Sequence, residues 1–180
     1  MNGPLLSKGL VSVYTGPGRG KTTAALGLAL RVLGWGGRVS VVQFIKGYAE
    51  IGEAKFAESF GERFTLRQFA IDLTPSIRQD DVLKRREAAE EALSCAESVI
   101  ASGEHDLVIL DEVNNALHYG LISVSRVLKM LAAKPCHVEV VLTGRQAPEE
   151  IIEAADYVTE MKPIKHPFEK GIAARRGIDY

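Results

Sequence analysis

One stretch of the sequence decides the fold: Gly16-Pro17-Gly18-Arg19-Gly20-Lys21-Thr22-Thr23. The residues before it, 10–14, are apolar and β-branched and predict a buried strand. The residues after it, 24–31, predict a helix. A strand, a Gly-rich turn and Gly-Lys-Thr at the start of a helix together indicate a phosphate-binding loop.

The chemistry of such a loop suits a polyphosphate. Its backbone N–H groups point inward, and the helix adds the positive end of its dipole. A Cβ would block close approach of the phosphates and would forbid positive φ, so glycines are needed. Lys21 supplies a mobile positive charge, and the Thr22 hydroxyl is placed to ligate Mg²⁺. We expect the nucleotide to be held by Gly16, Pro17, Gly18, Arg19, Gly20, Lys21, Thr22 and Thr23.

The spacing of the loop departs from the common pattern G-x-x-x-x-G-K-[ST]. That pattern places its first glycine at position 15, where this chain has Thr15, and the glycine follows at Gly16. The alternative is an ordinary Gly-rich turn with a surface lysine, but strand, loop and helix agree with the phosphate-loop interpretation. The shorter spacing hints at an uncommon orientation of the nucleotide.

Composition limits the possible classes of protein. A chain of 180 residues suits one domain, 1–180, and the net charge of −1 argues against a large surface for nucleic acid. The sequence shows neither a signal peptide nor a stretch that could span a membrane. Cys95 and Cys136 are interpreted as buried structural thiols in a reducing compartment. We therefore expect a cytoplasmic protein with no nucleic-acid or membrane partner.

Apolar strands alternate with helical segments along the chain. This alternation predicts an α/β fold: a single-domain P-loop NTPase-like (RecA-like) structure whose mostly parallel sheet has helices on both faces. Residues 48–77 are hard to place, apart from an alternating run at 64–69. Further strands are expected at 38–45, 106–112, 137–142 and 157–161, and helices at 78–102, 113–119, 123–133 and after Pro148.

Two further strand ends should meet the phosphate loop, because the carboxyl ends of parallel strands share one edge of a sheet. Asp111-Glu112 follows four apolar residues and resembles a Walker B element. Asp111 would hold Mg²⁺ directly or through water, and Glu112 would ligate the metal, orient a water or bond the ribose. The alternative is a helix N-cap made of two acids. Arg145, after Thr143-Gly144, would donate to phosphate oxygens.

Two basic residues leave alternatives open. Arg31 lies ten residues after Lys21, nearly three helical turns away, and would either contact the nucleoside or cover the helix surface. The spacing does not decide between these roles. His166 would either bind a cofactor or be structural, and because it is a single histidine in a basic tail we interpret it as structural.

Several motifs together resemble the P-loop class of ATP:corrinoid adenosyltransferases, also called cob(I)alamin adenosyltransferases. The resemblance covers nearly the whole chain in order, and the shortened loop is the family's own version. Its stretches are residues 15–25 (TGPGRGKTTAA), 42–47 (VQFIKG), 110–112 (LDE), 143–145 (TGR), 155–161 (ADYVTEM), 165–168 (KHPF) and the ending 171–180.

The resemblance implies transfer of the 5′-deoxyadenosyl group of ATP to the Co(I) of a reduced corrinoid, either cob(I)alamin or cobyrinic acid a,c-diamide. Co(I) attacks C5′ of an ATP that lies reversed in the loop, and triphosphate leaves. Lys21, Glu112 and Arg145 would then be catalytic residues. Arg31 would lie near the nucleoside, and Mg²⁺ would be held by Thr22, Asp111 and Glu112. No protein nucleophile is needed, because Co(I) is itself the nucleophile.

The family also implies a homodimer, a flavoprotein reductant and a role in biosynthesis or salvage of adenosylcobalamin, the vitamin B12 coenzyme. Some members displace the lower axial base of cobalamin with a Phe and a Trp, and the corresponding positions here are Ile71 and Leu73. This predicts a different displacement or a corrinoid without that base. Well-known members cover the corrinoid with an N-terminal segment, whereas fifteen residues precede Gly16 here.

Three other functions share these motifs. A RecA-like ATPase would use Glu112 to orient a water and would release ADP and phosphate. A small nucleotide or metabolite kinase would need an acceptor site and an Arg-rich lid, which is not evident. A regulatory or corrinoid-carrier module would bind ATP without turnover.

Overall fold

The computed structural model describes residues 3–45, 51–69, 79–165, 167 and 171–179. A six-stranded sheet has the order β3-β2-β4-β5-β1-β6, and every neighbouring pair is parallel. This confirms the predicted fold class. The strands are β1 (Val11–Thr15), β2 (Val39–Gln43), β3 (Phe64–Gln68), β4 (Leu107–Asp111), β5 (Glu139–Thr143) and β6 (Tyr157–Glu160).

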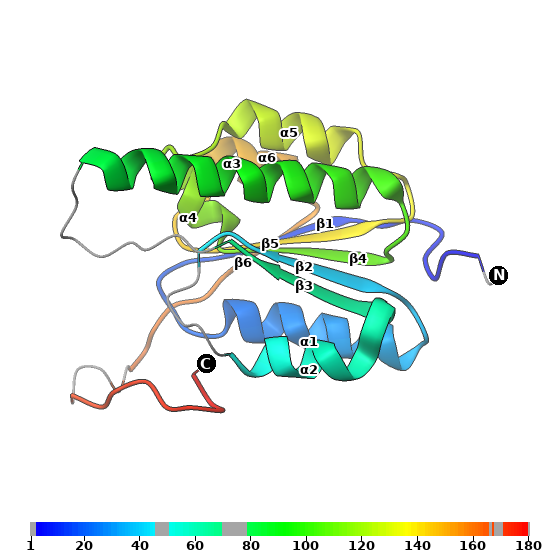
Figure 1. The fold of residues 1–180 in the computed structure, drawn as a ribbon, viewed down its shortest axis with the longest axis horizontal. Coiled ribbons are helices and arrows are strands. Elements are labelled where there is room, and N and C mark those ends of the chain that lie inside the picture. Colours follow the sequence, from blue (N-terminus) through cyan, green and yellow to red (C-terminus); the bar gives the residue numbers. More distant parts are fainter. Residues whose placement is uncertain (1–2, 46–50, 70–78, 166, 168–170, 180) are drawn as a thin grey trace.

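Helices cover both faces of the sheet, as Figure 1 shows. One face carries α1 (Lys21–Gly34) and α2 (Gly52–Phe60), which is followed by a 3-10 turn, Gly61–Arg63. The other face carries α3 (Gln79–Ser102), α4 (Val113–His118), α5 (Val124–Ala132) and α6 (Glu149–Ala154). None of the described helices is both long and apolar enough to cross a bilayer.

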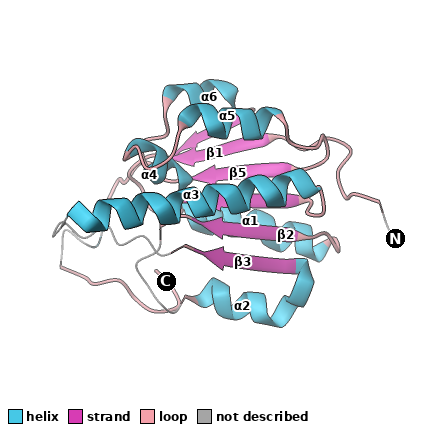
Figure 2. Ribbon diagram, turned by 45° about the horizontal axis from the view of Figure 1, so that its top comes forward, coloured by secondary structure: helices cyan, strands magenta, loops and turns pink. Residues whose placement is uncertain are grey.

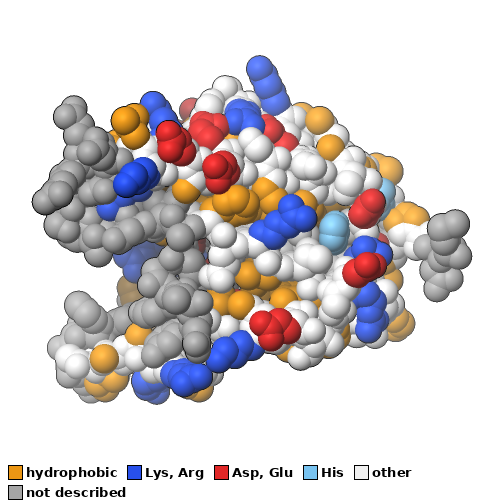
Figure 3. Space-filling model, viewed as in Figure 1, with side chains coloured by type: hydrophobic (Ala, Val, Ile, Leu, Met, Phe, Trp, Pro, Cys, Tyr) orange, Lys and Arg blue, Asp and Glu red, His pale blue; other side chains and the backbone are white. Residues whose placement is uncertain are grey.

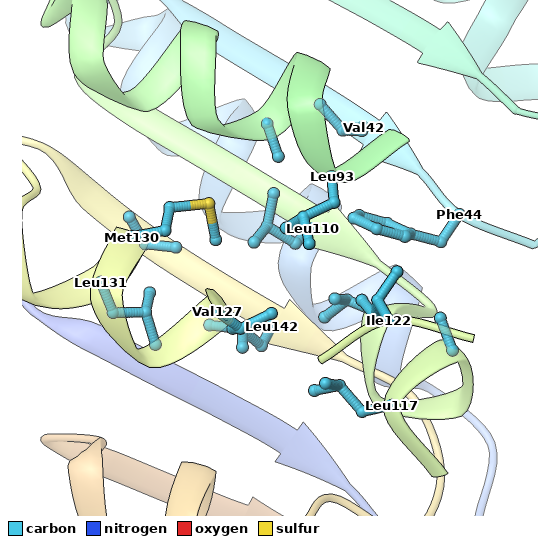
Figure 4. Close-up of a cluster of buried hydrophobic side chains, with 14 of the residues drawn as sticks. Val42, Phe44, Leu93, Leu110, Leu117, Ile122, Val127, Met130, Leu131 and Leu142 are labelled. Carbon is cyan, nitrogen blue, oxygen red and sulfur yellow. The ribbon is translucent and has the colours of Figure 1, made fainter. Parts of the chain in front are cut away.

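The larger core lies under α3, α4 and α5 (Figure 4). Phe44, Leu93 and Leu110 are fully buried there, and Met130 fills the space beneath α5. Truncation of one such leucine to alanine costs about 2–5 kcal/mol of unfolding free energy. Small residues on the inner face of α3, Ala89 and Ala92 among them, let that helix approach the sheet closely.

The smaller core lies under α1. Ala25, Ala29 and Leu33 recur every fourth residue on one helical face and pack on strand residues that include Val41 and Ile109. Central strands such as β4 are therefore buried on both faces, and their sequences are uninterrupted apolar runs rather than alternating ones.

The structure corrects the expectation that both cysteines are buried, and it adds one helix that was not predicted. The thiol of Cys136 is exposed and that of Cys95 is half-buried, so neither is a fully buried structural thiol. Helix α2 was not anticipated in residues 48–77. It buries none of its own residues fully, and its Phe56 and Phe60 pack on each other and toward β3.

The outer face of the long helix α3 is exposed to solvent. Acidic and basic side chains are intermixed over the helical layer at the top of Figure 3. Arg126 of α5 forms ion pairs with Glu90 and Glu97 of α3, which ties the two helices together. These charges are therefore engaged with one another rather than gathered into a basic patch.

All strands end on the same side of the molecule. In Figure 2 their arrowheads point to one side, and the C-terminal tail returns to that side below the sheet. Ligands of open parallel sheets bind outside the carboxyl ends of the strands. A functional site is therefore expected at this edge.

Candidate active site

The Gly-rich segment 16–23, which we call the phosphate-type loop because its sequence resembles a phosphate-binding loop, connects β1 to α1, and its glycines determine its backbone conformation. Gly16 and Gly20 have φ of 93° and 112°, values that favour glycine. The sequence predicts that phosphates lie against the glycines of this loop. In the structure a Cβ on Gly16 or Gly18 would lie 2.7 or 2.5 Å from the carbonyl oxygen of Met161. The loop thus packs on the chain after β6, where the Gly18 N–H donates to that oxygen at 2.6 Å.

Lys21 opens α1, and its side chain turns back over the loop. Its ammonium donates to the carbonyl oxygens of Gly16 at 2.8 Å and Gly18 at 2.7 Å. The residue is only 7% exposed. Burial lowers the pKa of Lys21 below its ordinary value, while Glu112 raises it and Arg145 lowers it further. The two hydrogen bonds hold the ammonium over the loop, near Glu112 and Arg145 of the neighbouring strand ends.

Asp111 lies at the end of β4 and is fully buried. One carboxylate oxygen accepts the hydroxyl of Thr22 at 2.8 Å and that of Thr143 at 2.7 Å. The other accepts the side-chain amide of Gln43 at 3.2 Å. Asp111 therefore joins the loop helix to the ends of β2 and β5 through one carboxylate.

Glu112 follows in the left-handed conformation, with φ of 62°. A non-glycine residue in this region is strained, by an amount on the order of 1 kcal/mol. Its N–H donates to the Thr143 hydroxyl at 2.9 Å, so the backbone is fixed by β5. Its side chain makes no capping bond to α4, so the side chain does not perform the alternative role of helix cap.

Asn115 links the acid to the arginine. Its side-chain amide donates to the Glu112 carboxylate, and its oxygen accepts the backbone N–H of Arg145 at 2.6 Å. A Cβ on Gly144 would lie 3.0 Å from that oxygen, and Gly144 has φ of 131°. A glycine at this position lets the end of β5 approach α4 closely. Asn115 of α4 can therefore bond both the Glu112 carboxylate and the backbone of Arg145.

These groups border one cavity of about 510 Å³. This volume lies within the range of small-molecule sites, roughly 300–1,000 Å³. The phosphate-type loop lines one side, joined by Glu112 and Arg145. The other side is the C-terminal tail, with Pro167, Ile172, Ala173, Ala174, Arg175, Ile178 and Asp179.

An ion pair holds the tail to the loop. The guanidinium of Arg19 donates to the carbonyl oxygen of Ile178 at 2.6 Å and lies 2.9 Å from the Asp179 carboxylate. Asp179 also accepts the Arg175 N–H at 2.9 Å and its guanidinium at 3.1 Å. The backbone N–H and side chain of Arg175 lower the pKa of Asp179.

The oxygen atoms at the strand ends suit a hard cation. Thr22 and Asp111 are in direct contact, and hydroxyl and carboxylate oxygens are ligands that Mg²⁺ prefers. In the described ranges no three or more His, Cys, Asp or Glu side chains gather as a metal cage. Mg²⁺ usually keeps several waters and substrate phosphates and needs few protein ligands. The residues therefore fit a magnesium ion that arrives with a nucleotide.

The structure brings most of the expected site residues together. Lys21, Thr22, Glu112 and Arg145 line the cavity, and Asp111 lies behind them. Among the described lining residues Arg31 does not occur, so its contact with a nucleoside stays a prediction. Ile71, Leu73 and His166 lie outside the described residues.

Sequence reasoning missed three contributors: Gln43, Asn115 and the cavity-lining tail. Gln43 carried a detectable signal, because it is a polar residue that ends an apolar strand, as Asp111 does. Asn115 lies in a short helix and shows no such pattern. The contact between tail and loop joins residues 159 positions apart, which no local pattern indicates.

Comparison with known proteins bears on this site. A sequence model of the family described as ATP:corrinoid adenosyltransferase BtuR/CobO/CobP matches residues 7–180. A corrinoid adenosyltransferase of Pseudomonas aeruginosa is 41% identical over 175 residues, which cover 96% of this chain and 84% of that protein. One of Escherichia coli K12 is 37% identical, covering 96% and 86%. Corrinoid adenosyltransferase CobA of Salmonella typhimurium is 36% identical with the same coverage.

Proposed function

This chain belongs to the ATP:corrinoid adenosyltransferase family, and from that premise we propose what its cavity does. The protein transfers the 5′-deoxyadenosyl group of ATP to the Co(I) of a reduced corrinoid and releases triphosphate. The bond from C5′ to its oxygen breaks, and a bond from C5′ to cobalt forms with the electron pair of Co(I). The family favours this reaction over hydrolysis of ATP to ADP and phosphate.

One observation supports a role for particular residues in this reaction. Three strand ends and the N-terminus of α1 meet at one cavity, and Lys21 and Arg145 line it. The leaving group is the whole triphosphate, so negative charge grows on the phosphate end as the bond breaks. Lys21, Arg145 and the N–H groups of the loop would stabilise that charge more in the transition state than in the ground state.

The other polar residues of the site would hold and orient the substrate. We infer that Thr22 and Asp111 hold Mg²⁺, which neutralises phosphate charge when bound. Glu112 would bond a ribose hydroxyl or a ligand water of that ion, with Asn115 fixing its carboxylate. No side chain has to act as nucleophile, because Co(I) supplies the electron pair.

Several expectations from the sequence extend this proposal. We infer one domain over 1–180, a homodimer, a cytoplasmic location and a flavoprotein that reduces the corrinoid. The choice between cob(I)alamin and cobyrinic acid a,c-diamide depends in part on Ile71 and Leu73, whose structure is not described. Alanine at both positions should change turnover of one corrinoid relative to the other, and unchanged turnover of both corrinoids would contradict that role.

An anaerobic assay tests the proposed reaction. The protein is mixed with MgATP and chemically reduced cob(I)alamin, the Co(I) absorbance is followed, and the released phosphates are separated. We expect loss of the Co(I) signal with one triphosphate for each cobalt adenosylated. ADP and phosphate with an unchanged Co(I) signal would contradict the proposal. The base-free corrinoid is run in parallel, so that corrinoid preference is separated from inactivity.

A further inference from the structure

Gln43 is a glutamine at a position where the fold favours an apolar residue. It ends β2, a strand that is buried throughout, and its side chain is fully buried. Its side-chain oxygen Oε1 has no hydrogen-bond partner among the described residues. Burial of an unpaired amide oxygen costs free energy that an apolar side chain of the same shape would not cost. A function for the amide nitrogen would account for a glutamine at this position.

The side-chain nitrogen of Gln43 lies between two carboxylates. Nε2 donates to Asp111 Oδ2 at 3.2 Å and to Glu53 Oε1 at 3.4 Å. An amide nitrogen carries two hydrogen atoms, so it can donate to both acceptors at once. The opposite orientation of the amide would place its oxygen against both carboxylates, with no hydrogen to share. The two acids therefore determine which way the amide points.

The two acids come from different elements. Asp111 ends β4 and lies beside Gln43 in the parallel register of β2 and β4. Glu53 lies in the first turn of α2 and lines an adjoining cavity of about 200 Å³ with Thr22 and Thr23. Carboxylates that approach each other away from bulk water repel, and a donor shared between them reduces that repulsion. Gln43 thus separates an acid of α2 from the acid of β4.

The bond from Gln43 also sets the rotation of the Asp111 carboxylate. Oδ1 of Asp111 accepts the hydroxyls of Thr22 and Thr143, at 2.8 and 2.7 Å. Oδ2 accepts the amide of Gln43, so both carboxylate oxygens are held. Without the amide, the carboxylate is free to turn about its Cβ–Cγ bond. Oδ1 would then lose its alignment with the Thr22 hydroxyl.

We propose that Gln43 is a positioning residue for the magnesium ion that arrives with ATP. Its amide holds the Asp111 carboxylate in line with Thr22 and keeps the carboxylate of Glu53 apart from it. Gln43 does not touch the ion itself, because its side chain is fully buried. The inference rests on the proposed function, in which Thr22 and Asp111 hold Mg²⁺.

The contribution of Mg²⁺ to ATP binding tests this role. Calorimetric titrations give the Kd of ATP with Mg²⁺ and with a chelator in its place. The Kd with chelator divided by the Kd with Mg²⁺, which we call the magnesium ratio, measures what the ion contributes. Gln43→Met keeps the length of the side chain and removes the donor, so we expect the magnesium ratio to fall about tenfold. The Kd of metal-free ATP should stay within about twofold.

Gln68→Met is the matched control for this substitution. Gln68 ends β3 at the position that pairs with Gln43 in the parallel register, and it is exposed. The chemical change is the same, but the residue does not line the phosphate cavity. Its magnesium ratio should equal that of the unaltered protein.

Removal of the second acid provides a rescue test. In Glu53→Gln, the carboxylate that the amide keeps apart from Asp111 is gone. Gln43→Met should therefore lower the magnesium ratio by only about threefold in the Glu53→Gln background. A general loss of packing would not be rescued by a change in α2, so this coupling separates positioning from a structural role. If the methionine variant does not fold, Gln43→Glu keeps the shape of the side chain and should lower the ratio by at least about tenfold.

Three results would overturn the assignment. An unchanged magnesium ratio in Gln43→Met would mean that the threonines alone position Asp111. An equal fall with and without the Glu53 carboxylate would mean that the amide does not act by separating the two acids. A larger ratio in Gln43→Glu would make this side chain a ligand of the ion. Failure of the proposed function is distinct, because the unaltered protein would show it: Mg²⁺ would not strengthen ATP binding, or bound ATP would adenosylate no cobalt.

Discussion

Acids lie at both edges of the sheet, and one at each edge, Asp106 or Asp111, is buried, yet only one edge has the features of an active site. At the amino edge, each acid is bonded to backbone. Asp106 accepts the N–H groups of Leu5 and Arg38 at 2.7 and 2.8 Å. Asp156 accepts the Val11 N–H at 2.8 Å. These carboxylates satisfy backbone donors that would otherwise be buried without partners.

At the carboxyl edge, the acids are bonded mainly by other side chains. Asp111 is held by the hydroxyls of Thr22 and Thr143, and Glu112 by the amide of Asn115. This network ends at the cavity, and its backbone is strained at Glu112. A buried acid thus indicates function when its partners are side chains that border a cavity, and stability when its partners are backbone N–H groups.

The largest expected effect is a loss of activity when a residue at the carboxyl edge is replaced. Lys21→Ala removes the buried charge beside the phosphate cavity, so we expect kcat/KM to fall by at least about 10²-fold. Lys129→Ala, on the exposed face of α5, should leave kcat/KM unchanged. Anaerobic rates of Co(I) loss measure both variants. Near-normal turnover by Lys21→Ala would contradict the placement of the site.

Asp106→Ala should give the opposite pattern. It leaves two backbone N–H groups without their acceptor, so the free energy of unfolding should fall by about 2–4 kcal/mol. Adenosyl transfer per folded molecule should stay within about twofold, because the amino edge lies outside the cavity. Urea unfolding and the Co(I) assay measure the two quantities. A loss of turnover without a loss of stability would break the comparison.

Glu112→Gly tests whether the backbone strain at Glu112 is kept because its carboxylate is needed for turnover. Glycine accepts a φ of 62° without strain, so stability should be unchanged or higher by up to about 1 kcal/mol. Turnover should fall at least about tenfold, because the carboxylate is lost. Gln146→Gly is the matched control: Gln146 is exposed and has φ of 53°. It should gain similar stability and retain activity, whereas equal activity losses would remove the distinction.

The smallest expected effect concerns Glu139 at the amino edge, whose carboxylate accepts the Leu10 N–H at 2.6 Å. Burial raises the pKa of Glu139, although that N–H opposes the shift. The folded state therefore holds its proton more tightly than the unfolded state, and stability falls as pH rises through the raised pKa. Glu139→Gln should raise the melting temperature at pH 7 by about 2 °C. The gain should vanish below pH 4.5, where the acid is protonated in both states. A gain independent of pH would point to packing instead.

Much of the fold follows from the sequence because periodicity is strong where strands are buried on both faces. The apolar run of β4 and the i, i+4, i+8 face of α1 are examples. Helix α2 was not predicted, because it is short and buries none of its residues fully. The pair Phe56 and Phe60, four residues apart, is the signal that could have placed it.

The sequence predicted those site residues that directly follow a strand or its loop. Parallel topology brings Lys21, Asp111 and Arg145 together without further information. The contributions of Asn115 and the C-terminal tail were not predictable, because they depend on the approach of segments that are distant in sequence. Local patterns therefore identify the side of the cavity formed by the loop and the strand ends, whereas the side formed by the C-terminal tail follows only from the tertiary structure.

The central claim is that ATP is cleaved between C5′ and oxygen at the carboxyl edge. ATP carrying ¹⁸O in the oxygen that joins C5′ to the α-phosphate tests it most directly, with reduced corrinoid present and the products analysed by mass spectrometry. We predict that the label leaves in triphosphate and that the corrinoid gains the adenosyl group without it. Label retained on ADP, with unlabelled phosphate and unaltered corrinoid, would contradict the account.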